Sequence, residues 1–293
     1  MNISLFIELL FNSLVLGVLI ALVAIGFNII FGVTKVFHIA HGAVYVSGAY
    51  VFWWFLECGF NVIFVLAALV IVTSFLAVVI ERLVYQPLYK KKSSQAITLI
   101  SSMGVYIFLT NLLALLFGNQ TISARLDLGG MQSAGNLFID PIQVFQLGVG
   151  VIIIGLFFCG LRSSWFLKIR AVVSEADTAS VIGVNIFKLR YVSMIIGSLL
   201  AVVTAVLYFY DGGLSPQSGM QITLTAVVAV IIGGTDSYKG TIAASLLIAL
   251  LQTGTEWYLS SQWKEGVTFL LLIAVLLWRT EGILSFKLRV EEQ

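Results

Sequence analysis

The sequence predicts an all-α polytopic integral membrane protein. Of its 293 residues, 60% are hydrophobic and only 10% are charged, whereas an ordinary globular domain has about 25% charged residues. The chain also carries nine apolar runs, and one bilayer crossing needs about 20 mostly apolar residues. These runs lack the alternation of barrel strands, and lipid cannot satisfy bare backbone polar groups, so we expect them to be helices. We expect one transmembrane domain over residues 1–293.

The nine runs are Ile3–Phe31, Ile39–Leu56, Val62–Ile80, Ala96–Phe117, Val144–Leu161, Tyr191–Tyr210, Met220–Ile232, Ile242–Tyr258 and Val267–Leu277. The first run has no cationic leader and is far longer than the roughly 7 to 15 residues of a signal-peptide core, so we expect it to stay attached. The run Met220–Ile232 is short, so it and its successor are alternatively two half-helices. Ile39–Leu56 is alternatively re-entrant, which would move the N-terminus inside. The sequence therefore predicts 8 to 10 helices.

Positive charges are distributed unevenly over the loops. Short cytoplasmic loops carry an excess of Lys and Arg. If all nine runs cross and the N-terminus lies outside, only Arg125 and Lys264 of the 16 basic residues fall outside. This topology places the C-terminus in the cytoplasm. The net charge is only +2, and the basic residues form no continuous stripe along the sequence. Nucleic-acid binding is therefore not expected.

Three loops are longer than a tight turn. Glu81–Gln95 and Arg162–Arg190 are predicted to lie inside, and Gly118–Gln143 outside. The segment Arg162–Arg190 has few helix breakers and carries apolar residues at helical spacing, so it should form one or two short amphipathic helices. Gly183 is the expected helix stop.

Ionisable residues deep in a span would indicate a proton- or sodium-coupled carrier. The acidic residues of the runs lie near run ends, where we expect water to solvate them: Glu8, Glu57, Glu81 and Glu256. No phosphate-binding loop of the G-x-x-x-x-G-K-[ST] type occurs, so we expect no ATPase in this chain and no bound cofactor.

An enzymatic or metal site is not expected either. His38 and His41 are the two histidines of the chain, and no carboxylate accompanies them in the same segment. We expect them to lie in a turn that leads into the second helix, with a structural role for His41. Cys58 and Cys159 lie at the ends of different runs, on opposite predicted sides, which argues against a disulfide or a zinc site.

Three sequence blocks carry a resemblance to a known family. They read GFNIIFGVTKVFHIAHGAVYVSGAY from Gly26, ERLVYQPLYKKKSSQAITLISSMGVYIFLTN from Glu81, and LSPQSGMQITLTAVVAVIIGGTDSYKG from Leu214. In this order they resemble permeases of branched-chain amino acid ABC importers, a family that also contains urea and short-chain amide permeases. The chain departs from the usual pattern at His38, Gln86, Val227 and Asp236. The motif turns are formed by Gly32, His41, Gly42, Gly233, Gly234 and Gly240. Glycines at such turns also allow tight bends and close helix packing.

The resemblance implies a subunit of a bacterial inner-membrane importer that works by alternating access. Its implied partners are a second homologous permease, two cytoplasmic ATP-binding subunits that hold ATP and Mg, an extracytoplasmic solute-binding protein, and membrane lipid. The segment 162–190 resembles the coupling region of such importers, with Arg170, Glu175, Ala176, Asp177 and Gly183 as its candidate residues.

The polar residues of the runs are candidates for the translocation pathway or, equally, for interhelical hydrogen bonding. They are Asn28, Tyr45, Ser101, Ser102 and Asn111, together with Thr98, Tyr208 and Thr223. Branched-chain amino acids are the solute that the resemblance favours. The alternatives are a urea or short-chain amide permease of the same family, and an ATP-independent facilitator for a small neutral solute.

Overall fold

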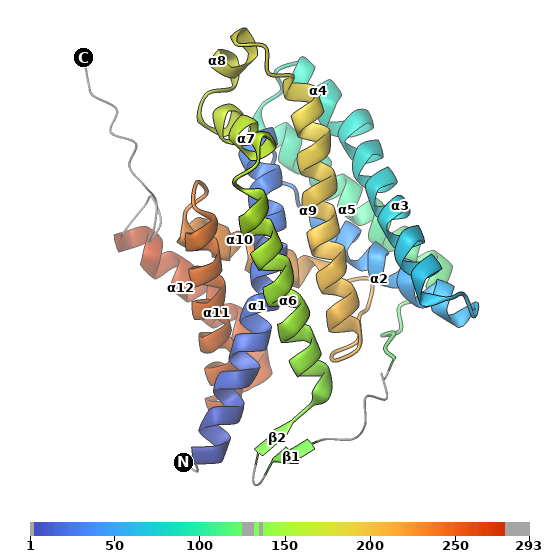
Figure 1. Cartoon of the computed structure of the whole chain (residues 1–293), viewed down its shortest axis with the longest axis vertical. Helices are drawn as coiled ribbons and strands as arrows, with labels where there is room; N and C mark the ends of the chain where they lie inside the picture. Colours follow the sequence, from blue (N-terminus) through green and yellow to red (C-terminus); the bar gives the residue numbers. More distant parts are fainter. Residues whose placement is uncertain (1–2, 125–131, 135–136, 279–293) are drawn as a thin grey trace.

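The computed structural model describes residues 3–124, 132–134 and 137–278. Its helices are α1 (Ile3–Thr34), α2 (His41–Glu57), α3 (Val62–Ile80), α4 (Gln86–Lys90), α5 (Gln95–Phe117), α6 (Pro141–Gly160), α7 (Ser164–Ser174), α8 (Ala176–Val181), α9 (Ile186–Phe209), α10 (Ser218–Gly233), α11 (Tyr238–Tyr258) and α12 (Lys264–Trp278). A π-helical turn, Glu81–Tyr85, joins α3 to α4, and a 3-10 turn, Ser261–Trp263, precedes α12. Two short strands, β1 (Gln132–Ala134) and β2 (Leu137–Ile139), form an antiparallel hairpin (Figure 1).

The all-α polytopic fold is confirmed. Each of the nine apolar runs lies on a helix, namely α1, α2, α3, α5, α6 and α9 to α12. In the described part of the chain, six helices are long and apolar enough to cross a membrane. Helices α2 and α10 have only 17 and 16 residues. The number of crossings and the cytoplasmic C-terminus therefore stay predictions, and the C-terminal tail lies outside the described residues.

Helix α1 forms the centre of the molecule, and from Val15 onward nearly every side chain on it is buried. It packs against α6, α9, α10 and α11 (Figure 1). Helices come closest where two glycines meet. A Cβ atom on Gly26 of α1 would lie 2.5 Å from the carbonyl oxygen of Gly197 on α9. Gly42 of α2 and Gly219 of α10 touch in the same way. Backbone contact at small residues is a common way for membrane helices to associate.

The prediction of a loop over Glu81–Gln95 is wrong for most of that range. Val62 to Lys90 is one unbroken helical segment, and the loop shrinks to four residues after Lys90. The π-helical turn ends at Tyr85, two residues before Pro87. Proline cannot donate a backbone hydrogen bond, and its ring clashes with the carbonyl four residues earlier in an α-helix. The wider turn removes that clash, so the helix continues through the proline.

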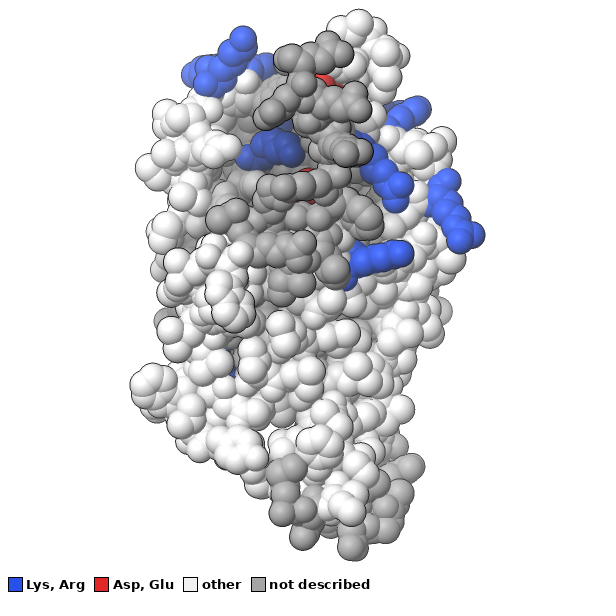
Figure 2. Space-filling model, turned by 90° about the vertical axis from the view of Figure 1, so that its left-hand side faces the viewer, with Lys and Arg blue, Asp and Glu red and all other residues white. Residues whose placement is uncertain are grey.

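The two ends of the molecule differ. Helix α1 begins at the end that carries the β1–β2 hairpin, and α4, α7 and α8 lie at the opposite end (Figure 1). At the hairpin end, Ile122 and Leu214 form a β-bridge with 2.8 Å backbone hydrogen bonds. On the face that Figure 2 shows, Lys and Arg side chains gather in the upper half, toward α4, α7 and α8. The positive-inside rule predicts that this end is cytoplasmic.

Candidate transport pathway and coupling segment

A pocket of about 290 Å³ lies between α1, α2, α9, α10, α11 and α12, close to the lower end of the roughly 300–1,000 Å³ usual for ligand pockets. We call it the outer pocket. It is lined by Leu16, Leu19, Ile20, Tyr45, Thr121, Thr204, Tyr208, Gly212, Gly213, Leu214, Ser218, Gln221, Ile222, Thr225, Gln252 and Lys264. Thr121, Gly212 to Leu214 and Lys264 belong to segments that the charge distribution predicts to lie outside. The pocket is therefore expected to face the exterior.

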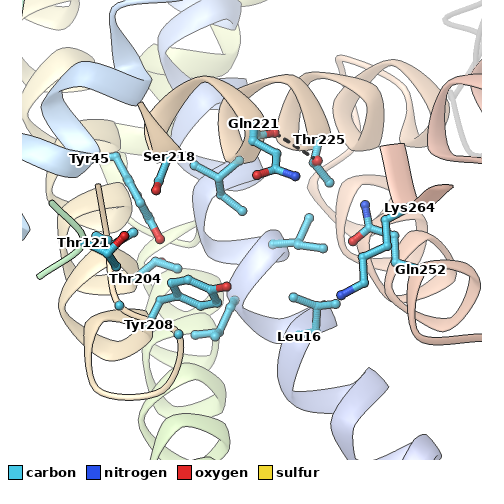
Figure 3. A pocket seen from close by; sticks show the side chains of 16 residues that line it. Leu16, Tyr45, Thr121, Thr204, Tyr208, Ser218, Gln221, Thr225, Gln252 and Lys264 are labelled. Atoms are coloured by element: carbon cyan, nitrogen blue, oxygen red, sulfur yellow. Dashed lines mark hydrogen bonds between the residues drawn. The ribbon is translucent and has the colours of Figure 1, made fainter. Parts of the chain in front are cut away.

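One side of the outer pocket is polar because of the helical spacing on α10. Ser218, Gln221 and Thr225 recur every three or four residues, which places them on one face of the helix (Figure 3). The Thr225 hydroxyl donates a 3.0 Å hydrogen bond to the Gln221 carbonyl oxygen. The hydroxyl groups of Tyr45 and Tyr208 point into the same space (Figure 3).

The opposite side of the outer pocket is apolar, and α1 supplies it through Leu16, Leu19 and Ile20. At the edge of the pocket, Lys264 forms an ion pair with Glu256 of α11. The neighbouring Glu265 accepts a hydrogen bond from the Gln221 amide. The outer pocket thus combines an aliphatic wall and neutral hydrogen-bonding groups with the Lys264–Glu256 ion pair and a second carboxylate, Glu265, at its edge.

Only some of the predicted pathway residues meet at this pocket. Tyr45 and Tyr208 line it. Asn28 is buried and donates a 2.8 Å hydrogen bond to Thr241. The side chains of Thr98, Ser101, Asn111 and Thr223 donate to backbone oxygens of their own helices or helix caps. The predicted set is therefore spread over several places in the fold.

Three polar residues that line the pocket were not predicted as pathway residues: Gln221, Gln252 and Lys264. The signal that could have found Gln221 is the polar spacing Ser218, Gln221, Thr225 within an otherwise apolar run. Gln252 donates a 2.9 Å hydrogen bond to Thr268, which ties α11 to α12 beside the pocket. The Lys264–Glu256 ion pair forms across the turn between these helices. The position of Glu256 near the end of an apolar run does not indicate that Lys264 is its partner.

The turn before α2 holds a buried polar cluster around His38. The Tyr85 hydroxyl lies 2.7 Å from Nδ1 of His38 and donates a 2.8 Å hydrogen bond to Ser102. Ser102 also accepts from the backbone N–H of Ala40 at 3.1 Å. His38 and His41 are fully buried, and burial lowers the pKa of His38 well below its usual value. Among the described residues, no group of three potential metal ligands occurs.

The second motif turn is built from glycines that meet one another. Gly234 ends α10 with φ of +91°, a backbone conformation that favours glycine. Gly233 lies against the backbone of Gly240 at the start of α11. In the first motif turn, Gly32 lies against Val173 of α7, and a Cβ there would be 3.2 Å from it. Their roles in transport stay predictions.

Glu81 corrects the expectation that acidic residues at run ends are solvated by water. Its side chain is only 1% exposed and accepts a 2.5 Å hydrogen bond from Nε of Arg190, which is equally buried. Arg190 also donates to the Thr34 carbonyl oxygen at 3.2 Å and lies 4.6 Å from the ring centre of Tyr89. The arginine thus joins the first residues of α9 to the end of α1 and to the π-helical turn.

The segment 162–190 contains two short helices, as the sequence predicts. Helix α7 buries Phe166, Ile169 and Val172 and exposes Lys168 and Arg170. Helix α8 lies at the edge of the molecule, next to α7 (Figure 1).

The candidate coupling residues lie around this second helix. Glu175 is exposed and precedes α8, which begins with Ala176 and contains Asp177. Gly183 follows α8 with φ of +87°, so the predicted helix stop is confirmed. Their part in coupling stays a prediction.

Comparison with known proteins gives consistent results. Residues 9–276 match the family described as "Branched-chain amino acid transport system / permease component". The chain is 30% identical to the high-affinity branched-chain amino acid transport system permease protein LivH of Escherichia coli (strain K12), with 96% of each chain covered. LivH of Salmonella typhimurium gives the same identity and coverage. BraD of Pseudomonas aeruginosa is 29% identical, again over 96% of both chains.

No solved structure gives a significant match. The family match covers far more than half of the chain and includes all three motif blocks and the whole segment 162–190. The multi-pass helical architecture agrees with it. The chain therefore belongs to the family of permease components of branched-chain amino acid transport systems.

Proposed function

We propose that this chain is a permease subunit of an ABC importer that carries branched-chain amino acids across the bacterial cytoplasmic membrane. The observation that carries the proposal is the 30% identity to LivH over 96% of both chains. The proposed complex contains a second homologous permease, two ATP-binding subunits and an extracytoplasmic solute-binding protein. ATP and Mg belong to the ATP-binding subunits, and this chain catalyses no reaction.

In the proposed mechanism, α7 and α8 transmit the closure of the ATP-binding subunits to the membrane helices. The contacts on this route support the proposal. Val173 on α7 lies against Gly32 of α1, and the Lys35 side chain donates to the Val173 carbonyl oxygen at 3.4 Å. At the other end of the segment, Arg190 contacts Thr34 and Glu81. A displacement of the segment 162–190 would therefore act on α1, α3 and α9 together.

Transport is tested with proteoliposomes that hold this chain, its partner subunits and the binding protein. We expect leucine uptake that requires both ATP and the binding protein. Uptake by this chain alone without ATP would replace the proposal with a facilitator. ATP-driven uptake of urea or acetamide in preference to leucine would identify the other branch of the family.

The coupling role is tested with Gly183→Leu, because a leucine is strained at φ of +87°. We expect leucine uptake to fall about tenfold while the complex still assembles, within the roughly 0.5–2 kcal/mol by which such mutations change coupling. Gly183→Asn should recover uptake, since asparagine tolerates this conformation better.

The matched control is Gly59→Leu. Gly59 lies in the turn between α2 and α3, has φ of +79° and, like Gly183, has open space around its Cα. It carries similar backbone strain far from the segment 162–190. Equal losses of uptake in the two leucine variants would show that strain alone, and not a role in coupling, causes the defect.

A further inference from the structure

The Lys264–Glu256 ion pair lies at the edge of the outer pocket, on the turn between α11 and α12. Lys264 lines the pocket, and its side chain reaches toward the space in front of Leu16 (Figure 3). The two side chains are 27% and 51% exposed. Glu256 is also close enough to Tyr208, another lining residue, to interact with it electrostatically. Lys264 therefore offers the pocket an accessible ammonium group with the Glu256 carboxylate directly beside it, while the Glu265 carboxylate accepts from Gln221.

This arrangement suits a ligand that carries both charges. A free amino acid has a carboxylate and an ammonium group on the same carbon atom. A partly exposed ion pair contributes little to protein stability, so its partners exchange readily for those of an incoming zwitterion. The solute carboxylate would then accept from Lys264, and the solute ammonium would donate to Glu256. Each charge keeps a partner throughout the exchange.

The rest of the pocket fits an aliphatic side chain. Leu16, Leu19 and Ile20 form a continuous wall on one face of α1, where a branched alkyl group loses contact with water. The volume of about 290 Å³ suits a single small solute. On the α10 side, the Gln221 amide and the Thr225 hydroxyl can each donate or accept a hydrogen bond.

We propose that the outer pocket binds an aliphatic amino acid as a zwitterion, with Lys264 and Glu256 recognising its two charged groups and α1 its side chain. The inference rests on the proposed transport of branched-chain amino acids and adds a recognition site within the permease itself. The site discriminates against urea and simple amides, because a neutral solute cannot replace the ion pair between Lys264 and Glu256.

The test measures equilibrium binding of radiolabelled leucine to the assembled complex in nanodiscs, without the solute-binding protein. Competitors are 4-methylpentanoate, which lacks the ammonium group, and isopentylamine, which lacks the carboxylate. We expect each competitor to bind at least about tenfold more weakly than unlabelled leucine, as for the loss of one charge-assisted hydrogen bond. Equal competition by all three compounds would overturn the proposal.

Substitutions of Lys264 and Glu256 test which charged group of the ligand each residue recognises. Lys264→Met should weaken leucine binding about tenfold but should not weaken isopentylamine binding, because that amine has no carboxylate for the lysine to recognise and Glu256 is freed for its ammonium group. Glu256→Gln should weaken leucine binding but should not weaken 4-methylpentanoate binding, because Lys264 is freed for the carboxylate of that ligand. Lys264→Arg keeps the positive charge and should bind leucine nearly as well as the wild type. A merely structural ion pair would instead affect all three ligands equally.

Lys91→Met is the matched control, since Lys91 is an exposed lysine in the turn before α5. It should bind leucine like the wild type, whereas a loss as large as that of Lys264→Met would overturn the proposal. Uptake of leucine is measured on the same preparations. Wild-type complex that imports leucine but shows no pocket binding contradicts this inference alone. Wild-type complex that binds leucine without ATP-driven uptake contradicts the proposed function instead.

Discussion

Among single residues, Glu81 and Arg190 are the Asp, Glu, Lys or Arg side chains that the described part of the molecule buries almost completely. Glu81→Gln keeps the size of the side chain but leaves the arginine buried without a countercharge. We expect the free energy of unfolding to fall by about 3–5 kcal/mol, the usual cost of removing one partner of a buried pair. Denaturant titration in detergent measures the change.

Two further variants interpret that result. Glu57→Gln is the control, because Glu57 ends α2 in an exposed position and its loss should change stability little. The double variant Glu81→Leu/Arg190→Met should recover much of the loss, since apolar residues often replace a buried ion pair without cost. A Glu81→Gln protein as stable as the wild type would contradict this account of the pair.

His38 gives the molecule a pH dependence with a definite sign. Burial lowers its pKa in the folded state, whereas the unfolded chain has a pKa of about 6.5. Below that pH the unfolded state binds more protons, so stability is lost as the pH falls from about 6.5 toward the folded pKa. We expect the melting temperature in detergent to be lower at pH 5 than at pH 7.5.

His38→Asn removes one of the two buried histidines, His41 being the other, and should reduce this difference between the two pH values. The variant is also expected to be less stable at pH 7.5, because the 2.7 Å contact with Tyr85 is lost. A variant with the same fall in melting temperature as the wild type would show that another group causes the pH dependence.

At the scale of the elements, the crossing of α2 and α10 depends on two glycines in backbone contact. Gly42→Val would place its side chain onto the carbonyl group of Gly219. A backbone cannot withdraw as a flexible side chain can, so we expect a loss of at least about 1–3 kcal/mol and reduced yield of folded protein. Thermal denaturation of the purified protein measures it.

Gly104 on α5 is the control for this substitution, since a Cβ there would meet no atom within 4 Å. Gly104→Val should fold like the wild type apart from the small helix-propensity term. If both valine variants had the same melting temperature as the wild type, close packing at Gly42 would be unimportant for stability.

The existence of the helices could be predicted from the sequence much better than where each one continues or ends. Dense apolar runs predict helices, so all nine runs lie on helices, and the breaker-poor segment 162–190 contains α7 and α8. The continuation of α3 through Pro87 was missed because a proline usually ends a helix, and only the wider π-helical turn permits it. The hydrophobic pattern contains no sign of that turn.

The candidate site was less predictable for a different reason. Tyr45 and Tyr208 were named from their own polarity. The partners of Glu81 and Lys264 depend on which helix ends meet in space, and Glu81 and Arg190 are 109 positions apart. A single sequence shows a charge near a run end but not whether water or another side chain faces it.

For the molecule as a whole, the two cysteines report its orientation in the membrane. Both are free and exposed. Cys58 lies in the turn after α2, and Cys159 lies near the end of α6 that leads into α7. We expect a membrane-impermeant maleimide to label Cys58 in intact cells and Cys159 only after permeabilisation. The Cys159→Ser and Cys58→Ser variants separate the two signals by mass spectrometry.

The opposite pattern, with Cys159 labelled from outside, would invert the predicted topology and place α7 and α8 away from any cytoplasmic ATPase. Labelling of both cysteines in intact cells would contradict the assignment of the two ends to opposite faces. Either result would remove the coupling role proposed for the segment 162–190.

The contact of Gly42 with Gly219 also limits how this sequence can change over generations. A side chain at either position meets the backbone of the other, so the second glycine does not make the first one replaceable. Replacing the two glycines by larger residues one at a time, in either order, would therefore pass through a poorly folded single variant. Gly104, Gly148 and Gly155 have open space instead, so we expect related chains to vary there freely while both glycines of the crossing persist.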